Sequence, residues 1–133
     1  MTIQRINPDT MHKNPAFTQV ATVTNPKKWI FVGGQNGVDP TGKVVGKDIA
    51  SQSAQAYKNV ITALEAAGAS LDDVFKMTIY IVQGQDLRAG FAAVQAVQAE
   101  QKGKAAPPTV TGMFVAGLAN PDYLIEIEAV AAV

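Results

Sequence analysis

The stretch of sequence that decides the fold is VFKMTIYIV, residues 74–82. Its side chains alternate, which predicts a β-strand that places Phe75, Met77, Ile79 and Ile81 on one face. The stretch is rich in β-branched and aromatic residues, which favour strands. We therefore expect a central or near-central strand here, and the rest of the chain indicates what surrounds it.

Helical patterns precede and follow this strand. Between Asp48, which has the chemistry of an N-cap, and Gly68, apolar residues recur every three or four positions and predict an amphipathic helix. A second helix is expected to begin after Asp86 and to end near Gly103, ahead of Pro107. The residues expected to face inward on this second helix are Leu87, Phe91, Val94 and Val97.

The remaining apolar runs predict further strands at 3–6, 16–24, 29–35, 43–45, 109–115 and 124–133. Residues 25–28, Asn-Pro-Lys-Lys, have turn chemistry and predict a hairpin between the second and third runs. Two strand–helix units in so short a chain indicate an α+β fold, with a mixed sheet and both helices on one face. Copies of the same chain would most simply cover the other apolar face.

Composition excludes several classes of protein. The 133 residues, 47% of them apolar, fit one globular domain spanning 1–133, and eleven basic residues balance eleven acidic ones, without the basic stripe that nucleic-acid binding requires. Neither a signal peptide nor a membrane-spanning run is visible, which favours a cytoplasmic location. With no cysteine and His12 as the only histidine, no cluster of ligands for a transition metal is visible, and any metal would have to be a hard cation bound by carboxylates. We expect no metal site and no cofactor.

The sequence contains none of the common hydrolase or nucleotide-binding motifs. The cluster Gly33-Gly34-Gln35-Asn36-Gly37 is rich in glycine, but it ends a predicted strand and no helix starts directly behind it. A bulge or a close backbone approach is therefore favoured over a phosphate-binding loop.

The run Ile125-Glu126-Ile127-Glu128-Ala129 places two carboxylates on one face of an apolar strand. One interpretation is that this face is simply solvated. The other is that one carboxylate lines a cavity and acts as a base or orients water, because partial desolvation of a glutamate suits it to proton transfer. The pattern alone leaves both interpretations open.

Five motifs in order carry a resemblance that spans nearly the whole chain. They are Pro15-Ala16-Phe17-Thr18-Gln19, Phe31-Val32-Gly33-Gly34-Gln35, Asp39-Pro40-Thr41-Gly42, Ala66-Ala67-Gly68-Ala69-Ser70-Leu71-Asp72-Asp73-Val74 and Ile125-Glu126-Ile127-Glu128-Ala129-Val130-Ala131. Together they resemble the RidA/YjgF (L-PSP) family. The resemblance implies a chorismate-mutase-like fold and a homotrimer with small-molecule pockets between subunits.

Deaminases of that family hydrolyse enamines and imines, such as 2-aminoacrylate, to a 2-keto acid and ammonia without metal or cofactor. By resemblance, the water-orienting glutamate is Glu126, the family's pocket tyrosine falls on Phe17, and its pocket serine falls on Gly33, beside Gly34. The resemblance therefore implies a catalytic role for Glu126 and ligand contacts for the two glycines and Phe17.

The family's substrate-anchoring arginine falls on Val110, and moving the register by one gives Thr109 or Thr111. The only arginines, Arg5 and Arg88, lie elsewhere in the chain. The resemblance thus implies a divergent member without that anchor, for which 2-aminoacrylate is disfavoured. Its pocket, which would also include Met113, would suit a neutral or cationic ligand.

Three hypotheses for function follow. The first is hydrolysis of an imine or enamine other than 2-aminoacrylate, with Glu126 orienting water. The second is a non-catalytic protein that binds a small molecule in the same pocket, for sensing or regulation. The third is the ribonuclease activity attributed to some members of the family, which the balanced charge and the lack of a histidine or lysine cluster disfavour.

Overall fold

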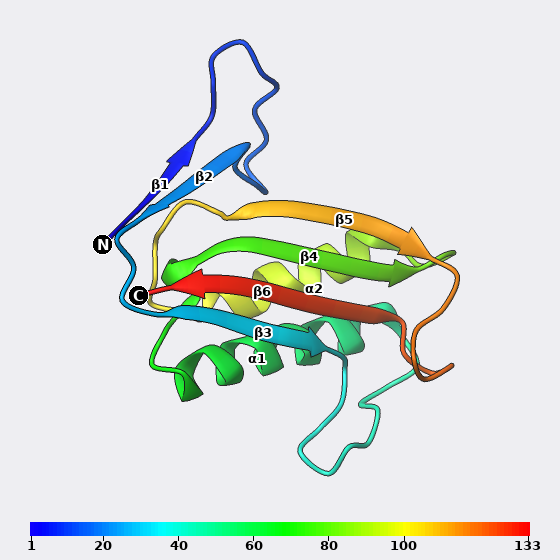
Figure 1. Cartoon of the computed structure of the whole chain (residues 1–133). Coiled ribbons are helices and arrows are strands. Elements are labelled where there is room, and N and C mark those ends of the chain that lie inside the picture. Colours follow the sequence, from blue (N-terminus) through cyan, green and yellow to red (C-terminus); the bar gives the residue numbers. More distant parts are fainter.

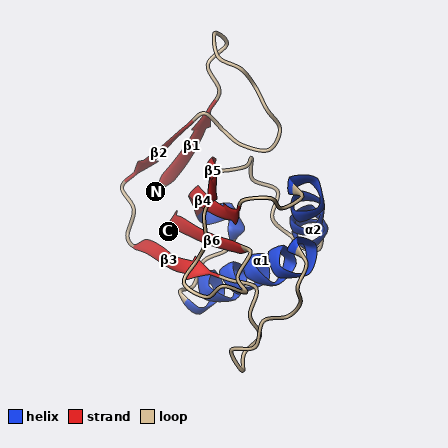
Figure 2. Cartoon of the chain, turned by 90° about the vertical axis from the view of Figure 1, so that its right-hand side faces the viewer, coloured by secondary structure: helices blue, strands red, loops and turns tan.

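Four strands form a mixed sheet in the order β3-β6-β4-β5, and two helices cover one of its faces (Figures 1 and 2). This computed structural model describes residues 1–133 and confirms the expected α+β fold. Its elements are β1 (Thr2–Ile6), β2 (Val20–Thr24), β3 (Trp29–Gln35), α1 (Ile49–Ala66), the short 3₁₀ turn Leu71–Asp73, β4 (Val74–Val82), α2 (Leu87–Ala99), β5 (Thr109–Val115) and β6 (Ile125–Ala132).

Strand β4 is an inner strand, as its sequence predicts, and it pairs antiparallel with β6 and parallel with β5. The prediction that Phe75 shares a face with Met77 is wrong. A register shift between Val74 and Lys76 inserts an extra residue, so Val74 turns into the core. The Phe75 ring instead packs edge-on against Trp29 of β3, with 5.6 Å between the ring centroids.

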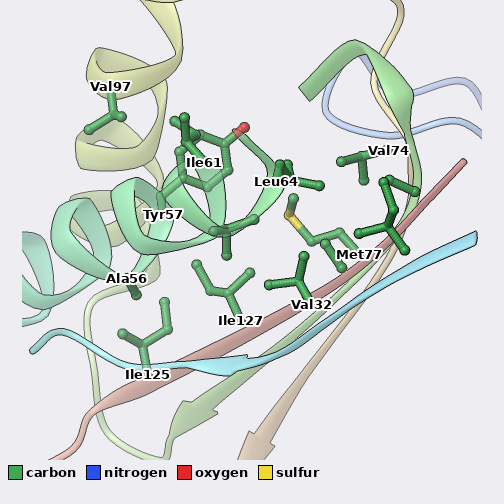
Figure 3. Close-up of a cluster of buried hydrophobic side chains, with 14 of the residues drawn as sticks. Val32, Ala56, Tyr57, Ile61, Leu64, Val74, Met77, Val97, Ile125 and Ile127 are labelled. Carbon is green, nitrogen blue, oxygen red and sulfur yellow. The ribbon is translucent and has the colours of Figure 1, made fainter. Parts of the chain in front are cut away.

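The hydrophobic core lies between the sheet and α1 (Figure 3). Alternate residues of β6 point toward the helices and are no more than 3% exposed: Ile125, Ile127, Ala129 and Ala131. From the opposite side, α1 contributes the fully buried Val60 and Leu64. Burying each large aliphatic side chain of this kind stabilises the fold by about 1.5–3 kcal/mol.

Helix α1 begins and ends where the sequence predicts. The Asp48 side chain accepts a hydrogen bond from the Ser51 backbone N–H at 2.8 Å, and Gly68, at φ 79°, follows the last turn. The fully buried Gln52 connects α1 to two loops. Its amide donates to the carbonyls of Gly46 and Asp122, and its oxygen accepts from the backbone N–H of Leu124. These bonds satisfy a polar side chain within the core.

The predicted hairpin between residues 16–24 and 29–35 does not form. Strand β2 pairs with β1 in a separate two-stranded sheet, whereas β3 pairs with β6. The connection does not fold back locally, because the backbone N–H groups of Lys27 and Lys28 both donate to the carbonyl of Val133, beyond β6. The strand predicted at 43–45 is reduced to an isolated bridge between Val38 and Val44.

Helix α2 departs from the inward packing predicted for it. Of the four residues expected to face the core, only Val97 is buried, while Leu87 and Phe91 remain 47% and 49% exposed. The helix packs against α1 rather than against the strands. An amphipathic pattern predicts which face of a helix turns inward, but not how closely that face approaches the sheet.

We expect Leu64→Ala to lower the free energy of unfolding by about 2–5 kcal/mol, because Leu64 is fully buried and its truncation leaves a cavity. The matched control is Leu87→Ala, which removes the same atoms from a half-exposed site and should cost less than about 1 kcal/mol. Urea denaturation at one fixed protein concentration measures both values. Equal losses in the two variants would contradict the placement of the core.

Candidate functional site

The face of the sheet that points away from the helices carries both carboxylates of β6. We call it the outer face. Pairing between β6, β4 and β5 arranges its side chains in rows. One row holds Glu126, Tyr80 and Met113, and the next holds Glu128, Thr78 and Thr111. Beyond β6, strand β3 adds the exposed side chains of Trp29 and Phe31 to this face.

The Glu126 carboxylate is held in place by a loop residue. The side-chain amide of Asn36 donates to Glu126 Oε1 at 3.2 Å and to the carbonyl of Ile125 at 2.9 Å. Asn36 is itself positioned from α1, because the Asn59 amide donates to the carbonyls of Asn36 and Val38 at 3.1 and 2.9 Å. Hydrogen bonds therefore connect the helix layer to a carboxylate on the outer face.

The two glycines at the end of β3 differ in what surrounds them. They lie in a register shift between Val32 and Gln35, as the bulge interpretation of the glycine cluster predicts. A Cβ built on Gly34 would lie 2.5 Å from Glu126 Oε2, whereas one on Gly33 would meet no atom within 4 Å. The carboxylate of Glu126 thus occupies space that only a glycine at position 34 leaves free.

A second polar pair joins the two rows, because Tyr80 lies in the row of Glu126 and Glu128 lies in the next row. The Tyr80 hydroxyl donates to Glu128 Oε1 at 2.8 Å. This hydrogen bond, together with burial and the negative charges of Glu128 and Glu126, raises the pKa of the Tyr80 phenol above its usual value. Near neutral pH the phenol therefore keeps its proton and can act as a hydrogen-bond donor beside two carboxylates.

Lys76 contributes a cation to the outer face, since it alternates with Met77 and pairs with Val130. It lies four residues along β4 from Tyr80, a separation of about 13 Å between Cα atoms. It forms no ion pair; the one ion pair in the structure joins Lys13 and Asp9 on the surface.

The structure brings together some of the residues implied by the resemblance and separates others. Gly34 lies against Glu126, with Gly33 next to it, and Met113 shares its row. Val110 pairs with Met77 and packs toward the helices, so Thr111 is the residue at that register whose side chain belongs to the outer face.

Phe17 lies on the loop between β1 and β2. Hydrogen bonds from Thr18 to the carbonyls of Pro107 and Pro108 hold this loop ahead of β5, which is the edge strand. Neither arginine side chain lies on the outer face. Arg5 donates to the backbone carbonyls of Asp72 and Val74, and Arg88 lies in the exposed first turn of α2.

Asn36, Tyr80 and Lys76 also belong to this site, although no motif in the sequence singles them out. Alternation along residues 74–82 contains the signal for Tyr80 and Lys76, since both fall opposite Met77. Their rows become visible only with the register between β4 and β6. The role of Asn36 depends on a loop conformation that no local pattern predicts.

No three histidine, cysteine or acidic side chains come close enough to hold a metal ion. Neither helix has the combination of length and apolar composition needed to cross a bilayer.

The family model "Endoribonuclease L-PSP" matches residues 11–133. The chain belongs to the RidA/YjgF (L-PSP) family. Among curated members, a RutC family protein of Pyrococcus horikoshii is 42% identical over 104 residues, which cover 77% of this chain and 78% of the relative. A 2-iminobutanoate/2-iminopropanoate deaminase of Salmonella typhimurium is 33% identical over 102 residues, covering 77% of each chain.

Solved structures of the family share the fold. A Rid family protein of unknown function, YyfB from Yersinia pestis, matches with a TM-score of 0.87 and 28% identity over 100% of both chains. E. coli TdcF, solved with bound serine, matches with a TM-score of 0.65 and 34% identity over 82% of this chain and 84% of TdcF.

We expect Gly34→Ala to displace the Glu126 carboxylate, because the new methyl group would overlap Oε2. The hydrogen bond from the Asn36 amide to Glu126 should be lost, which would shift the Asn36 side-chain ¹⁵N and ¹H resonances. Gly33→Ala is the matched control, since its methyl group would point into open space. If the Asn36 amide resonances move equally in both variants, the close approach of Gly34 and Glu126 is wrong.

Proposed function

We propose that this protein binds a small metabolite on the outer face around Glu126 and hydrolyses an imine or enamine there. The observation that carries the proposal is the fixed Glu126 carboxylate, with one oxygen bonded to Asn36 and the other beside the backbone of Gly34. The deaminase names of family members about one-third identical to this chain support the reaction class. The substrate we propose is an imine other than that of 2-aminoacrylate.

The proposed chemistry needs one carboxylate and one water molecule. Glu126 accepts a proton from the water while its oxygen adds to the C=N carbon, which gives a carbinolamine. The carboxyl group returns this proton to nitrogen. The carboxylate then takes the proton of the new hydroxyl group and passes it to the same nitrogen, so that the C–N bond breaks as the C=O bond forms, and a ketone and ammonia leave. Asn36 keeps the carboxylate oriented throughout. The Tyr80 hydroxyl, in the same row, donates its one proton to Glu128, so its oxygen is free to accept a hydrogen bond from the substrate.

We further propose that copies of the chain cover the outer face as a homotrimer and complete the walls of the site. Trp29 and Phe31 are 49% and 76% exposed on this face, which leaves large aromatic surfaces in water in a single chain. In such an assembly the loop carrying Phe17, at the far edge of the sheet, could reach the site of a neighbouring copy. Partial burial would also strengthen the hydrogen bonds of Glu126.

A non-catalytic binding function is the second candidate, and the placement of cations favours it. Both arginines lie away from the outer face, and Lys76 is about 13 Å along β4 from the row of Glu126. A single chain therefore offers a small carboxylate substrate no guanidinium beside Glu126. A charge-assisted hydrogen bond contributes about 1.5–3 kcal/mol, so its absence weakens capture of a small anion at least tenfold.

We expect Glu126→Gln to lower ammonia and keto-acid release from a panel of neutral and acidic imines by at least a hundredfold, because the amide cannot accept the proton of water. The matched control is Glu65→Gln, the same substitution at an exposed site on α1, which should retain wild-type rates. Wild-type turnover that persists in Glu126→Gln would contradict the catalytic role of this residue.

Thr111→Arg distinguishes the two candidate functions, because it adds a guanidinium to the outer face in the row next to Glu126. If catalysis is intact and only the anion anchor is missing, this variant should gain activity toward 2-aminoacrylate. A wild-type protein that binds imines but releases no ammonia, and a Thr111→Arg variant that remains inactive, would favour the binding function.

We expect Phe31→Asp to dissociate the trimer into monomers, because it would bury an unpaired charge between subunits. Phe91→Asp, an equal change at an exposed site on α2, should leave the trimer intact. Analytical ultracentrifugation measures the oligomeric state of the wild-type protein and of both variants. A wild-type monomer, or a Phe31→Asp variant that stays trimeric, would contradict the proposed assembly.

A further inference from the structure

The structure contains a cavity of about 430 Å³ on the helix side of the sheet, away from the outer face. Ile79, Val110 and Ile125 form its floor, and Phe91 and Val94 of α2 form its roof. Its volume lies within the range of about 300–1,000 Å³ that is usual for small-molecule pockets. Because Ile125 and Ile127 line the cavity while Glu126 and Glu128 face outward, β6 separates it from the candidate catalytic site.

The cavity exists because α2 packs on α1 and stands away from the strands. The two helices approach closely at Gly90, where an added Cβ would lie 3.1 Å from Ser53 Oγ. This contact fixes α2 against α1. It leaves an unfilled space between the apolar face of α2 and the sheet. Leu87 and Phe91, about half-exposed, lie at the border of the cavity together with Pro15 of the loop between β1 and β2. A ligand could enter between these side chains.

The chemistry of the lining selects a class of ligand. None of the residues that line the cavity carries a charge, and most are apolar. A charged ligand would lose its hydration without gaining a partner, whereas a neutral apolar ligand would lose little. The lining therefore excludes charged ligands, both small carboxylates and cations.

Two residues of α1 that line this cavity, Tyr57 and Ser53, carry hydroxyls without a hydrogen-bond partner in the protein. Tyr57 is 4% exposed, and its hydroxyl takes part in none of the hydrogen bonds within the protein; Figure 3 shows its ring in the core. Ser53, one helical turn earlier, is fully buried, and its Oγ has no partner. Burial alone raises the pKa of Tyr57 to about 12, so the phenol is a neutral donor near neutral pH. A fully buried polar atom without a partner, such as Ser53 Oγ, is rare in proteins.

We propose that the cavity between α2 and the sheet binds a neutral, mainly apolar small molecule that accepts a hydrogen bond from Tyr57. The unpartnered phenol supplies a directional contact, and the apolar floor and roof supply most of the buried area. This site is separate from the imine hydrolysis proposed for the outer face and does not depend on it.

The experiment uses 2-naphthol as the probe and isothermal titration calorimetry of the full chain as the measurement. We expect one 2-naphthol per chain. Tyr57→Phe should weaken binding about three- to tenfold, since it removes one hydrogen bond and little volume. 2-Naphthoate, which has the same ring system with a charge, should bind at least a hundredfold more weakly than 2-naphthol.

Val94→Trp fills the cavity from the roof and should abolish binding, while Val20→Trp, at an exposed site on β2, is the matched control. Circular dichroism confirms that each variant is folded, and Val110→Phe fills the cavity from the floor if Val94→Trp does not fold. Three results would overturn the proposal: no binding to the wild-type chain, unchanged binding in the filled variant, or equal binding of naphthol and naphthoate. None of these results depends on ammonia release.

Discussion

The fold depends on the alternation of side chains along β6. This strand pairs with β3 on one side and with β4 on the other, so without it β3 would not be joined to β4 and β5. Its isoleucines and alanines fill the core beneath α1, and its two glutamates stand on the outer face. A one-residue change in register would bury both carboxylates and expose the isoleucines, which makes the register one of the best-determined features of the structure.

Hydrogen bonds between polar side chains and loop backbone connect helix α1 to the candidate site. Asn59 of α1 holds the backbone of the loop after β3, and the Asn36 side chain on that loop holds Glu126. Gln52, a further member of α1, ties down the loop that leads into β6. The carboxylate is therefore oriented by a scaffold of hydrogen-bonded amides, and such networks favour a single arrangement of their members.

Local patterns predicted the parts of this structure that depend on periodicity and capping. They predicted both helices, the Asp48 cap, the inner position of β4 and the shared face of Glu126 and Glu128. They failed where the structure depends on pairing between residues that are far apart in the sequence. The turn chemistry of residues 25–28 was overridden by hydrogen bonds to Val133, and a bulge moved Phe75 to the face opposite the one predicted.

The same limitation applies to the candidate site. Family motifs led to Glu126 and Gly34, which are in contact, but sequence alone could not show that Val110 faces the helices or that Tyr80 shares the row of Glu126. The strand order also has a consequence for folding of the nascent chain. Because β6 is last along the chain yet lies between β3 and β4, the sheet cannot close until residue 132 has left the ribosome. Until then, the apolar edges of β3 and β4 lack their partner, and the chain has to be kept from aggregating.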